Sequence, residues 1–536
     1  MILFRDDSVT MTDVRMPHVG DADSFANRML AGVLVVALPT LVTIALIAVL
    51  FKATLLDYFP RDSDELAYHQ QIAAFARAGF SSGYFTILEK PASFTFSHFG
   101  PHGPVFPLLY GSVGRVAGWT LQSGPIFNLV VLAMATAVFI VVGRLSRAQI
   151  VDLGFVMLTS WWVLFMLPTT MQETFHQSVM IVVAAFAARL LHPDTRRHHV
   201  VLMIALGVLV VASVMRPTNW IAAIPLVFIA FAPRGFRVAA LVTLLTGVAT
   251  LGFWLLWRYV SAPIPNLAID LPALSRVSLL QYAVGRASTN ARAVYDVRSL
   301  VAQPFSQYVM FESAVLVAAF GWFVARGLAR RRREKPRLSL GDDPTFKTDA
   351  FVLIGLGAAL AAFVGLYVEA DLSLSRVMAP FTLLVTLLLV ATRQRTRVVV
   401  LVVVGNVVIA PSFLSAYTDA RTGLFTYDRH PYERFRSQIA PFVTFDSSRE
   451  PWCNTLLTTV FIREIVALPP GVGLSVGEPP DAVRPAVRSR YLLTTDEGAR
   501  VFQSKATLRH LTTTEFGDLY ENLAVPCGAA RTARGQ

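Results

Sequence analysis

The sequence predicts a polytopic α-helical membrane protein with about eleven transmembrane helices, surface helices in its first outer loop and a small C-terminal α/β domain. Composition is the first observation behind this prediction. Of the 536 residues, 54% are hydrophobic and only 15% are charged, and the mean hydropathy is +0.55. Soluble domains carry about 25% charged residues. The second observation is that the apolar residues gather into runs of about 20, the length that crosses a bilayer as a helix.

The basic residues follow the pattern of a membrane protein rather than that of a nucleic-acid-binding protein. The formal net charge is +12, but Lys and Arg occur in short clusters between apolar runs. A nucleic-acid site would need them on one face of a domain. We therefore expect the lipid bilayer, and no nucleic acid, as a partner.

The first apolar run covers residues 30–51 and follows an N-terminal segment, 1–29, that contains several Asp residues. The run is longer than the hydrophobic region of a signal peptide, so we expect a retained membrane anchor. The other expected spans lie near residues 125–143, 150–168, 175–191, 199–215, 218–232, 238–257, 309–326, 350–369, 377–391 and 397–414.

Topology depends on the segment PVFPLLYGSVGRVAG, residues 104–118, which is apolar but short and interrupted by Arg115. If this segment lies on the membrane surface as a helix, all the strongly basic short loops fall on one side, which is then the cytoplasm. These loops are RLSR (144–147), RRHH (196–199), RGFR (234–237), RRRREK (330–335) and RQRTR (393–397). The N terminus is then cytoplasmic in the plasma (inner) membrane, and the first long loop, 52–123, is outside.

With about eleven spans and a cytoplasmic N terminus, the chain consists of a transmembrane region, 30–416, and an extracytoplasmic domain, 417–536. A tail of this length is long enough for a core of its own, and RYLLTTDEGARVFQS at 490–504 reads as a strand, a turn and the start of a helix. Cys453 and Cys527 lie in this tail. Outside the cytoplasm a disulfide between them is favoured, and the alternative is two unpaired thiols in a small core.

Polar residues gather at the expected outer ends of the spans, whereas the centres of the spans are nearly free of ionisable residues. Transporters place such residues within spans that face a cavity. This distribution favours chemistry at the outer interface over transport. The sequence also contains no Walker-type loop, GxSxG elbow or CxxC pair, so it gives no support for ATP-driven transport, serine hydrolysis or thiol redox chemistry.

The acidic cluster Asp62-Ser63-Asp64-Glu65 opens the most polar part of the first outer loop. Its three carboxylates repel one another when ionised, and one of them could act as a general base toward an acceptor hydroxyl. Paired carboxylates such as Asp62 and Asp64 also suit a divalent cation, Mg²⁺ or Mn²⁺, although no cofactor is required by the pattern. The alternative interpretation is an ordinary acidic start of a helix.

The order RDSDELAYHQQIAAFARAGF, SHFGPHGPVFPLLYGSVGRVAG and then a membrane span resembles the GT-C glycosyltransferases. The likeness is to the branch of protein mannosyltransferases and aminoarabinose transferases, and it covers about residues 30–235. This family has an acidic pair with a Tyr three residues on, which here matches Asp64-Glu65 and Tyr68. The resemblance implies that Asp64 is the base, with Glu65 and Asp62 in support. This sequence departs from the family in the extra acid Asp62 and in Gly103, which interrupts the usual His-Pro-Pro run.

The resemblance further implies a polyprenyl-phosphate-linked sugar donor and a hexosyl or pentosyl transfer to an extracytoplasmic glycan, lipid or protein, as in cell-wall glycan biosynthesis. The departing phosphate needs cationic partners. Arg216 and Arg376, at expected outer span ends, are similar to the family's phosphate-binding positions, and the alternative is that they extend to the interface without contacting substrate. Glu173 is expected near the active site.

Three histidines are further candidates for binding substrate. His176 lies one helical turn after Glu173, and His98 and His102 flank the Gly-Pro turns before the expected surface helix. Each is also explained by a structural hydrogen bond or a helix cap, and their spacing matches no standard zinc pattern.

Two other functions also agree with the sequence. A polysaccharide polymerase or ligase acting on lipid-diphosphate glycans would use a late outer loop rich in basic residues. The loop 258–308 contains such residues: Arg258, Arg276, Arg286, Arg292 and Arg298. The other alternative is a non-enzymatic flippase or transporter of lipid-linked sugars, against which the scarcity of polar residues within the spans argues.

Overall fold

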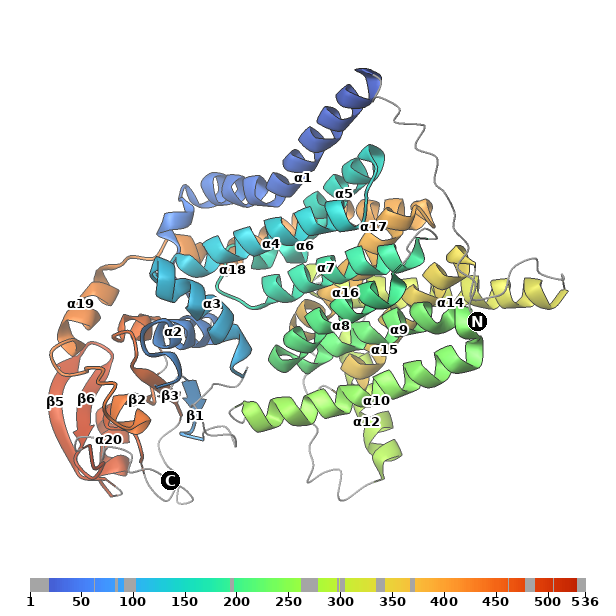
Figure 1. Ribbon diagram of the computed structural model, residues 1–536. Helices are drawn as coiled ribbons and strands as arrows, with labels where there is room; N and C mark the ends of the chain where they lie inside the picture. The colour runs from blue at the N-terminus through green and yellow to red at the C-terminus, as the bar shows by residue number, and fades with distance from the viewer. Residues whose placement is uncertain are drawn as a thin grey trace, which may run out of the picture.

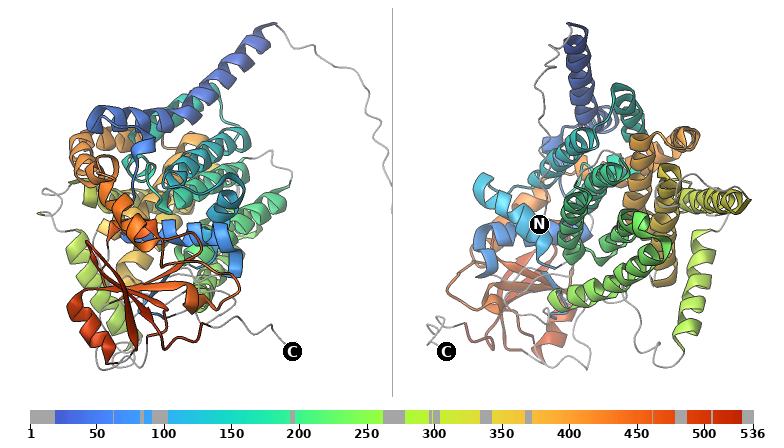
Figure 2. Two further views of the ribbon diagram at one scale, coloured as in Figure 1. Left: turned by 90° about the vertical axis from the view of Figure 1, so that its left-hand side faces the viewer. Right: turned by 45° about the vertical axis from the view of Figure 1, so that its right-hand side comes forward.

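The computed structural model describes residues 19–61, 63–81, 85–90, 103–192, 197–261, 278–295, 298, 304–333, 343–366, 372–460, 462–477, 487–504 and 506–527. It shows a bundle of long helices with a small mixed β-sheet at one end (Figure 1). Two further views show the same arrangement, with the sheet beyond one end of the helices (Figure 2). The protein is thus a multi-pass helical membrane protein with a small additional domain.

Eight described helices are long and apolar enough to cross a membrane, and a ninth span is formed if the bent pair α17 and α18 counts as one. The eight are α1 (Val19–Phe51), α4 (Ser123–Val142), α7 (Glu173–Leu191), α8 (His198–Met215), α10 (Phe236–Val260), α14 (Pro304–Arg333), α15 (Pro344–Leu366) and α16 (Leu372–Thr392). The bent pair is α17 (Thr396–Val408) and α18 (Ala410–Phe425), which meet at 53°. A further helix, α12 (Leu279–Val294), is polar.

Three of the eleven expected spans are divided into shorter helices, and one of them is the run 397–414, which forms the bent pair α17 and α18. The run 150–168 forms α5 (Arg147–Thr159) and α6 (Trp161–Met166), separated by Ser160 at φ −78° and ψ 78°. The Ser160 hydroxyl donates to Val156 O at 2.7 Å, a bond of a kind that bends helices. The run 218–232 forms η3 (Pro217–Ala222), α9 (Ala223–Phe231) and η4 (Ala232–Arg234). Pro217 starts this tighter segment because it cannot continue helix α8.

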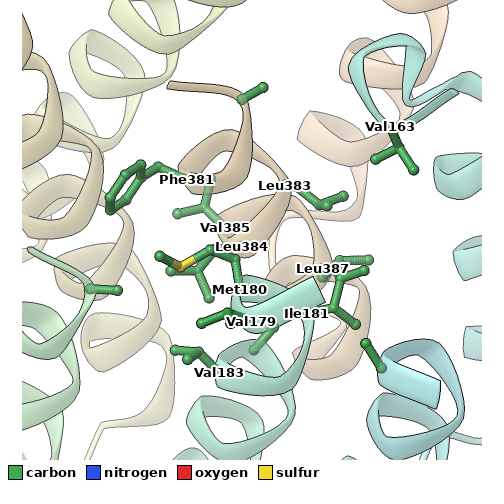
Figure 3. Close-up of a cluster of buried hydrophobic side chains, with 14 of the residues drawn as sticks. Val163, Val179, Met180, Ile181, Val183, Phe381, Leu383, Leu384, Val385 and Leu387 are labelled. Atoms are coloured by element: carbon green, nitrogen blue, oxygen red, sulfur yellow. The ribbon is translucent and has the colours of Figure 1, made fainter. Parts of the chain in front are cut away.

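Helices α7 and α16 form the centre of the bundle. In their spans 78% and 83% of the residues are buried, as expected for helices that are apolar on all sides. Figure 3 shows Val179, Met180 and Val183 of α7 close to Leu384 and Leu387 of α16. This packing fixes the ends of the two helices relative to each other.

The first loop contains η1 (Leu55–Asp57), α2 (Ser63–Ala78), η2 (Gly79–Ser81), β1 (Phe85–Ile87) and α3 (Val105–Ala117). Helix α3 has 13 residues and is about 20 Å long, too short to cross the bilayer. It buries Phe106 and Tyr110 and exposes Val116, so the segment expected on the membrane surface is an amphipathic helix. A Cβ at Gly111 would lie 2.8 Å from the Phe75 ring, which explains why α2 and α3 approach so closely.

The C-terminal domain is built on a six-stranded sheet with the order β1-β3-β2-β4-β6-β5. Its elements are α19 (His430–Ile439), η5 (Pro451–Asn454), β2 (Thr455–Thr458), η6 (Arg463–Ala467), β3 (Gly473–Val476), β4 (Tyr491–Thr494), α20 (Asp496–Gln503), β5 (Leu508–Thr514) and β6 (Gly517–Asn522). The strand and helix expected within 490–504 are β4 and α20. Cys453 and Cys527 form a disulfide.

One strand of this sheet, β1, comes from the first loop and pairs in parallel with β3. The Glu89 carboxylate, just after β1, accepts hydrogen bonds from the backbone N–H groups of Arg488 and Ser489. On α2, Gln70 Nε2 donates to Val472 O at 2.6 Å. The C-terminal domain therefore holds α2, the helix that begins with the acidic cluster.

Candidate active site

Helix α2 carries Asp64 and Glu65 in its first turn. Carboxylates are favoured there because they face the positive end of the helix dipole. Asp64 and Glu65 thus form the acidic start of a helix that the sequence allowed as an alternative. The two side chains have different surroundings. The Asp64 side chain is 35% exposed, whereas Glu65 is buried.

Glu65 fixes the chain that leads into α2. Its Oε1 accepts from the Tyr58 hydroxyl at 3.1 Å and its Oε2 from the Arg61 N–H at 3.1 Å. Burial, and then the nearby Glu65 charge, raise the pKa of Tyr58, so Tyr58 keeps the proton that it donates. These contacts favour a positioning role for Glu65 over the catalytic role that the sequence suggested.

Asp64 belongs to a chain of four alternating charges. Its Oδ2 accepts from an Arg376 guanidinium N–H at 3.1 Å. The Nε of Arg376 lies 3.7 Å from Glu173 Oε1, and the same oxygen accepts from Arg216 at 2.8 Å. We call Asp64, Arg376, Glu173 and Arg216 the charged chain; they come from α2, the start of α16, the start of α7 and the end of α8.

The two carboxylates and two guanidinium groups of the charged chain balance in charge, and their side chains differ in exposed fraction. The Glu173 side chain is fully buried, and those of Arg216, Arg376 and Asp64 are 13%, 27% and 35% exposed. A buried carboxylate is tolerated when cations compensate its charge. Glu173 therefore anchors two arginines, while Asp64 is the member most open to an incoming molecule.

Tyr68 lies one turn after Asp64 on α2, and its hydroxyl accepts a hydrogen bond from Gln172 Nε2 at 2.7 Å. Burial raises the pKa of Tyr68, and the charges of Asp64 and Glu173 add to this effect. The phenol is thus neutral beside the charged chain.

His176 is buried on α7, three residues after Glu173. Its Nδ1 lies 2.9 Å from Asn219 Nδ2, which also donates to Ala212 O at 2.9 Å. Because the amide is a donor, Nδ1 accepts and the ring proton is on Nε2. Asn219 follows Arg216 by one turn of η3, so His176 supports the segment that carries Arg216.

Four residues named in the sequence analysis fall outside the part of the chain that the structure describes: Asp62, His98, His102 and Arg276. Within the part of the chain that the structure describes, no three His, Cys, Asp or Glu side chains gather in a way that could hold a metal ion. Both carboxylates of the charged chain face arginines, so this donor set does not fit a divalent cation.

Other residues of the site were missed by the sequence analysis. Asn128 Nδ2 donates to Thr169 O at 2.7 Å and to Met171 O at 3.1 Å, which holds the turn before Glu173. The Tyr110 hydroxyl donates to the Asn128 side chain at 2.5 Å. The signal that could have revealed Asn128 is its position as a lone amide in the apolar run 125–143.

Comparison with solved structures finds two that are similar to this chain. The crystal structure of ArnT from Cupriavidus metallidurans bound to undecaprenyl phosphate is 13% identical, covers 92% of this chain and 99% of its own, and has a TM-score of 0.41. The apo structure of the same protein is 13% identical and covers 91% and 98%, with a TM-score of 0.40. No model of a known protein family matches the chain, and no curated protein matches it. The roles of the residues therefore rest on the contacts within this chain.

Proposed function

We propose that the protein is a GT-C-type glycosyltransferase that moves one sugar from a polyprenyl-phosphate donor to a hydroxyl-bearing acceptor outside the cytoplasm. The observation that carries this proposal is the charged chain. It joins an accessible carboxylate to two arginines at the end of the bundle where the C-terminal domain lies. An acid that can take a proton and cations that can meet a phosphate are the two groups that such a transfer needs.

In this mechanism the Asp64 carboxylate takes the proton of the acceptor hydroxyl. The acceptor oxygen forms a bond to the anomeric carbon as the bond from that carbon to the phosphate oxygen breaks, and polyprenyl phosphate leaves with the bonding electrons. Arg216 and Arg376 donate hydrogen bonds to the phosphate, whose negative charge grows as it departs. Glu173 keeps both guanidinium groups in place.

The contact between Arg376 and Asp64 links donor binding to the base. In the structure the Arg376 guanidinium donates to Asp64 Oδ2 at 3.1 Å and so occupies this carboxylate oxygen. A donor phosphate that engages Arg376 competes with Asp64 for the same N–H groups. Donor binding then releases Asp64 to accept the proton, so that an acceptor is activated only when a donor is present.

Membranes containing the full chain, supplied with a panel of radiolabelled polyprenyl-phosphate sugars, test the proposal. We expect transfer by the wild type and a fall of roughly 10²- to 10⁴-fold in Asp64→Asn, the range for loss of a general base. Asp57→Asn is the matched control. Asp57 is also in the first loop, but its carboxylate binds Thr54, so its loss should leave transfer unchanged. Full transfer by Asp64→Asn would refute the mechanism.

A further inference from the structure

A small cavity lies inside the helix bundle, and no member of the charged chain lines it. Its volume is about 50 Å³, and residues of α5, α6, α7, α14, α16 and α17 line it. The lining includes Trp162, Gln177, Glu312, Thr386 and Asn406. The space holds about three or four water molecules and is far smaller than the cavities that take sugars or lipid headgroups.

Glu312 is the acidic residue of this cavity and belongs to the span Pro304–Ala329. It is an exception to the expected lack of ionisable residues within the spans. Its side chain is 9% exposed, and its Oε1 has no hydrogen-bond partner among the described residues. Among those residues, the cavity lining contains no Lys, Arg or His, and its other titratable group is the Tyr308 phenol. An unpaired carboxylate at this depth is costly, so its charge needs compensation from an occupant.

Three further polar side chains of the lining offer acceptor oxygens to the cavity: Gln177, Thr386 and Ser160. Gln177 uses its amide nitrogen to donate to Trp162 O at 3.2 Å, and its Oε1 has no partner in the described structure. The Thr386 hydroxyl donates to Thr382 O at 2.8 Å, and that of Ser160 donates to Val156 O at 2.7 Å. A hydroxyl whose hydrogen is used in this way offers only lone pairs to the cavity.

We propose that this cavity binds one small monovalent cation through oxygen atoms of Glu312, Gln177 and Thr386. One acidic residue and several neutral oxygens match a single positive charge, and the cavity size restricts the occupant to an ion with at most a few waters. A retained water would also accept from Trp162 Nε1, a buried donor without a partner among the described residues.

The position of the cavity suggests what the cation does. Gln177 is four residues after Glu173 on α7, and Ala379, also in the lining, is three residues after Arg376 on α16. Each therefore lies one turn below a member of the charged chain. A cation bound between α7, α14 and α16 holds the two central helices at the spacing that the charged chain requires.

Thermal unfolding of the purified full chain tests this site without any sugar substrate. Sodium chloride is compared with choline chloride at equal ionic strength, between pH 6 and 8.5. We expect Na⁺ to raise the Tm of the wild type in a saturable way, by roughly 1 °C at tenfold excess over its Kd and by roughly 2 °C at hundredfold excess. In Glu312→Gln the Tm should no longer depend on Na⁺. In choline chloride this variant should unfold at or above the Tm of the wild type, because the substitution removes an uncompensated charge.

A matched pair of threonine variants on α16 provides the control. Thr386→Val should raise the apparent Kd for Na⁺, obtained from the dependence of Tm on Na⁺ concentration, about tenfold. Thr392→Val should leave it unchanged, because Thr392 bonds its own helix at Leu388 O in the same way but does not line the cavity. A Tm independent of Na⁺, a Na⁺ response that persists in Glu312→Gln, or stabilisation by acid alone would overturn the proposal. The last result would identify the occupant as a proton.

Discussion

At Glu173 one carboxylate oxygen accepts a hydrogen bond from Arg216 and lies 3.7 Å from Nε of Arg376. The side chain is fully buried, and its other oxygen has no hydrogen-bond partner among the described residues. The charge of Glu173 therefore serves mainly to hold the two arginines.

Glu173→Gln should destabilise the fold by about 3 kcal/mol, because it leaves two partly buried arginines without their shared counter-charge. Chemical unfolding of the purified protein measures this change. The control is Glu515→Gln, which breaks a surface pair with Arg434 in which the arginine is 59% exposed; its expected cost is under about 1 kcal/mol. Equal costs for the two variants would contradict the anchoring role of Glu173.

The sequence identified the members of the charged chain one at a time, as charged residues next to the ends of apolar runs. It did not predict their pairing, because Asp64 and Arg376 are 312 residues apart and Arg216 and Glu173 are 43 apart. The acidic cluster likewise did not reveal that Glu65 would turn inward to Tyr58, since no local pattern separates a buried carboxylate from an exposed neighbour.

At the scale of elements, α2 combines the start of the charged chain with a buried histidine. His69 Nδ1 accepts from Trp119 Nε1 at 3.3 Å. Burial lowers the pKa of His69 from 6.5 to about 4. The hydrogen bond needs the neutral ring, so packing of α2 near the start of α4 depends on a deprotonated His69.

Acid should therefore loosen this part of the first loop. Between pH 6.5 and about 4 the unfolded chain binds a proton at His69 that the folded chain does not, so stability falls as the pH is lowered through this window, by roughly 3 kcal/mol in all. Hydrogen exchange of α2 and α3 at pH 7.5 and 4.5 measures the effect. His69→Gln should flatten the pH dependence and His430→Gln, at an exposed position, should preserve it; the opposite pattern would exclude His69 as the cause.

Hydropathy predicted where the apolar helices lie better than where they break. The runs 150–168 and 218–232 are as apolar as their neighbours, yet the structure divides them at Ser160 and Pro217. Each break has a local chemical cause, a hydroxyl that bonds its own helix and a proline. Ser160 and Pro217 change the mean hydropathy of their runs too little for hydropathy to reveal the breaks.

At the scale of the whole molecule, the C-terminal domain and the first loop form one unit through β1, Glu89 and Gln70. The sequence indicated the strand and helix near 490–504 but gave no sign of β1. A strand of three residues shows no period, and its partner β3 lies almost 400 residues away along the chain.

This unit should lie outside the cytoplasm, since the basic loops occupy the other side of the predicted topology. An alkaline phosphatase reporter fused after Gln536 is expected to be active, and the same reporter inserted in the basic loop 330–335 to be inactive. A fluorescent protein that folds only in the cytoplasm should give the reverse pattern. Phosphatase activity in the loop alone would overturn the orientation.

The central claim is that Asp64 is the base and that the arginines of the charged chain bind the donor phosphate. It is tested most directly by measuring undecaprenyl phosphate binding and sugar transfer on the same purified variants. We predict that Asp64→Asn binds this lipid at least as tightly as the wild type, because Arg376 is released, yet loses transfer by at least about 100-fold. Arg376→Ala should weaken binding by about tenfold or more. Unchanged transfer by Asp64→Asn, or unchanged lipid binding by Arg376→Ala, would contradict the account.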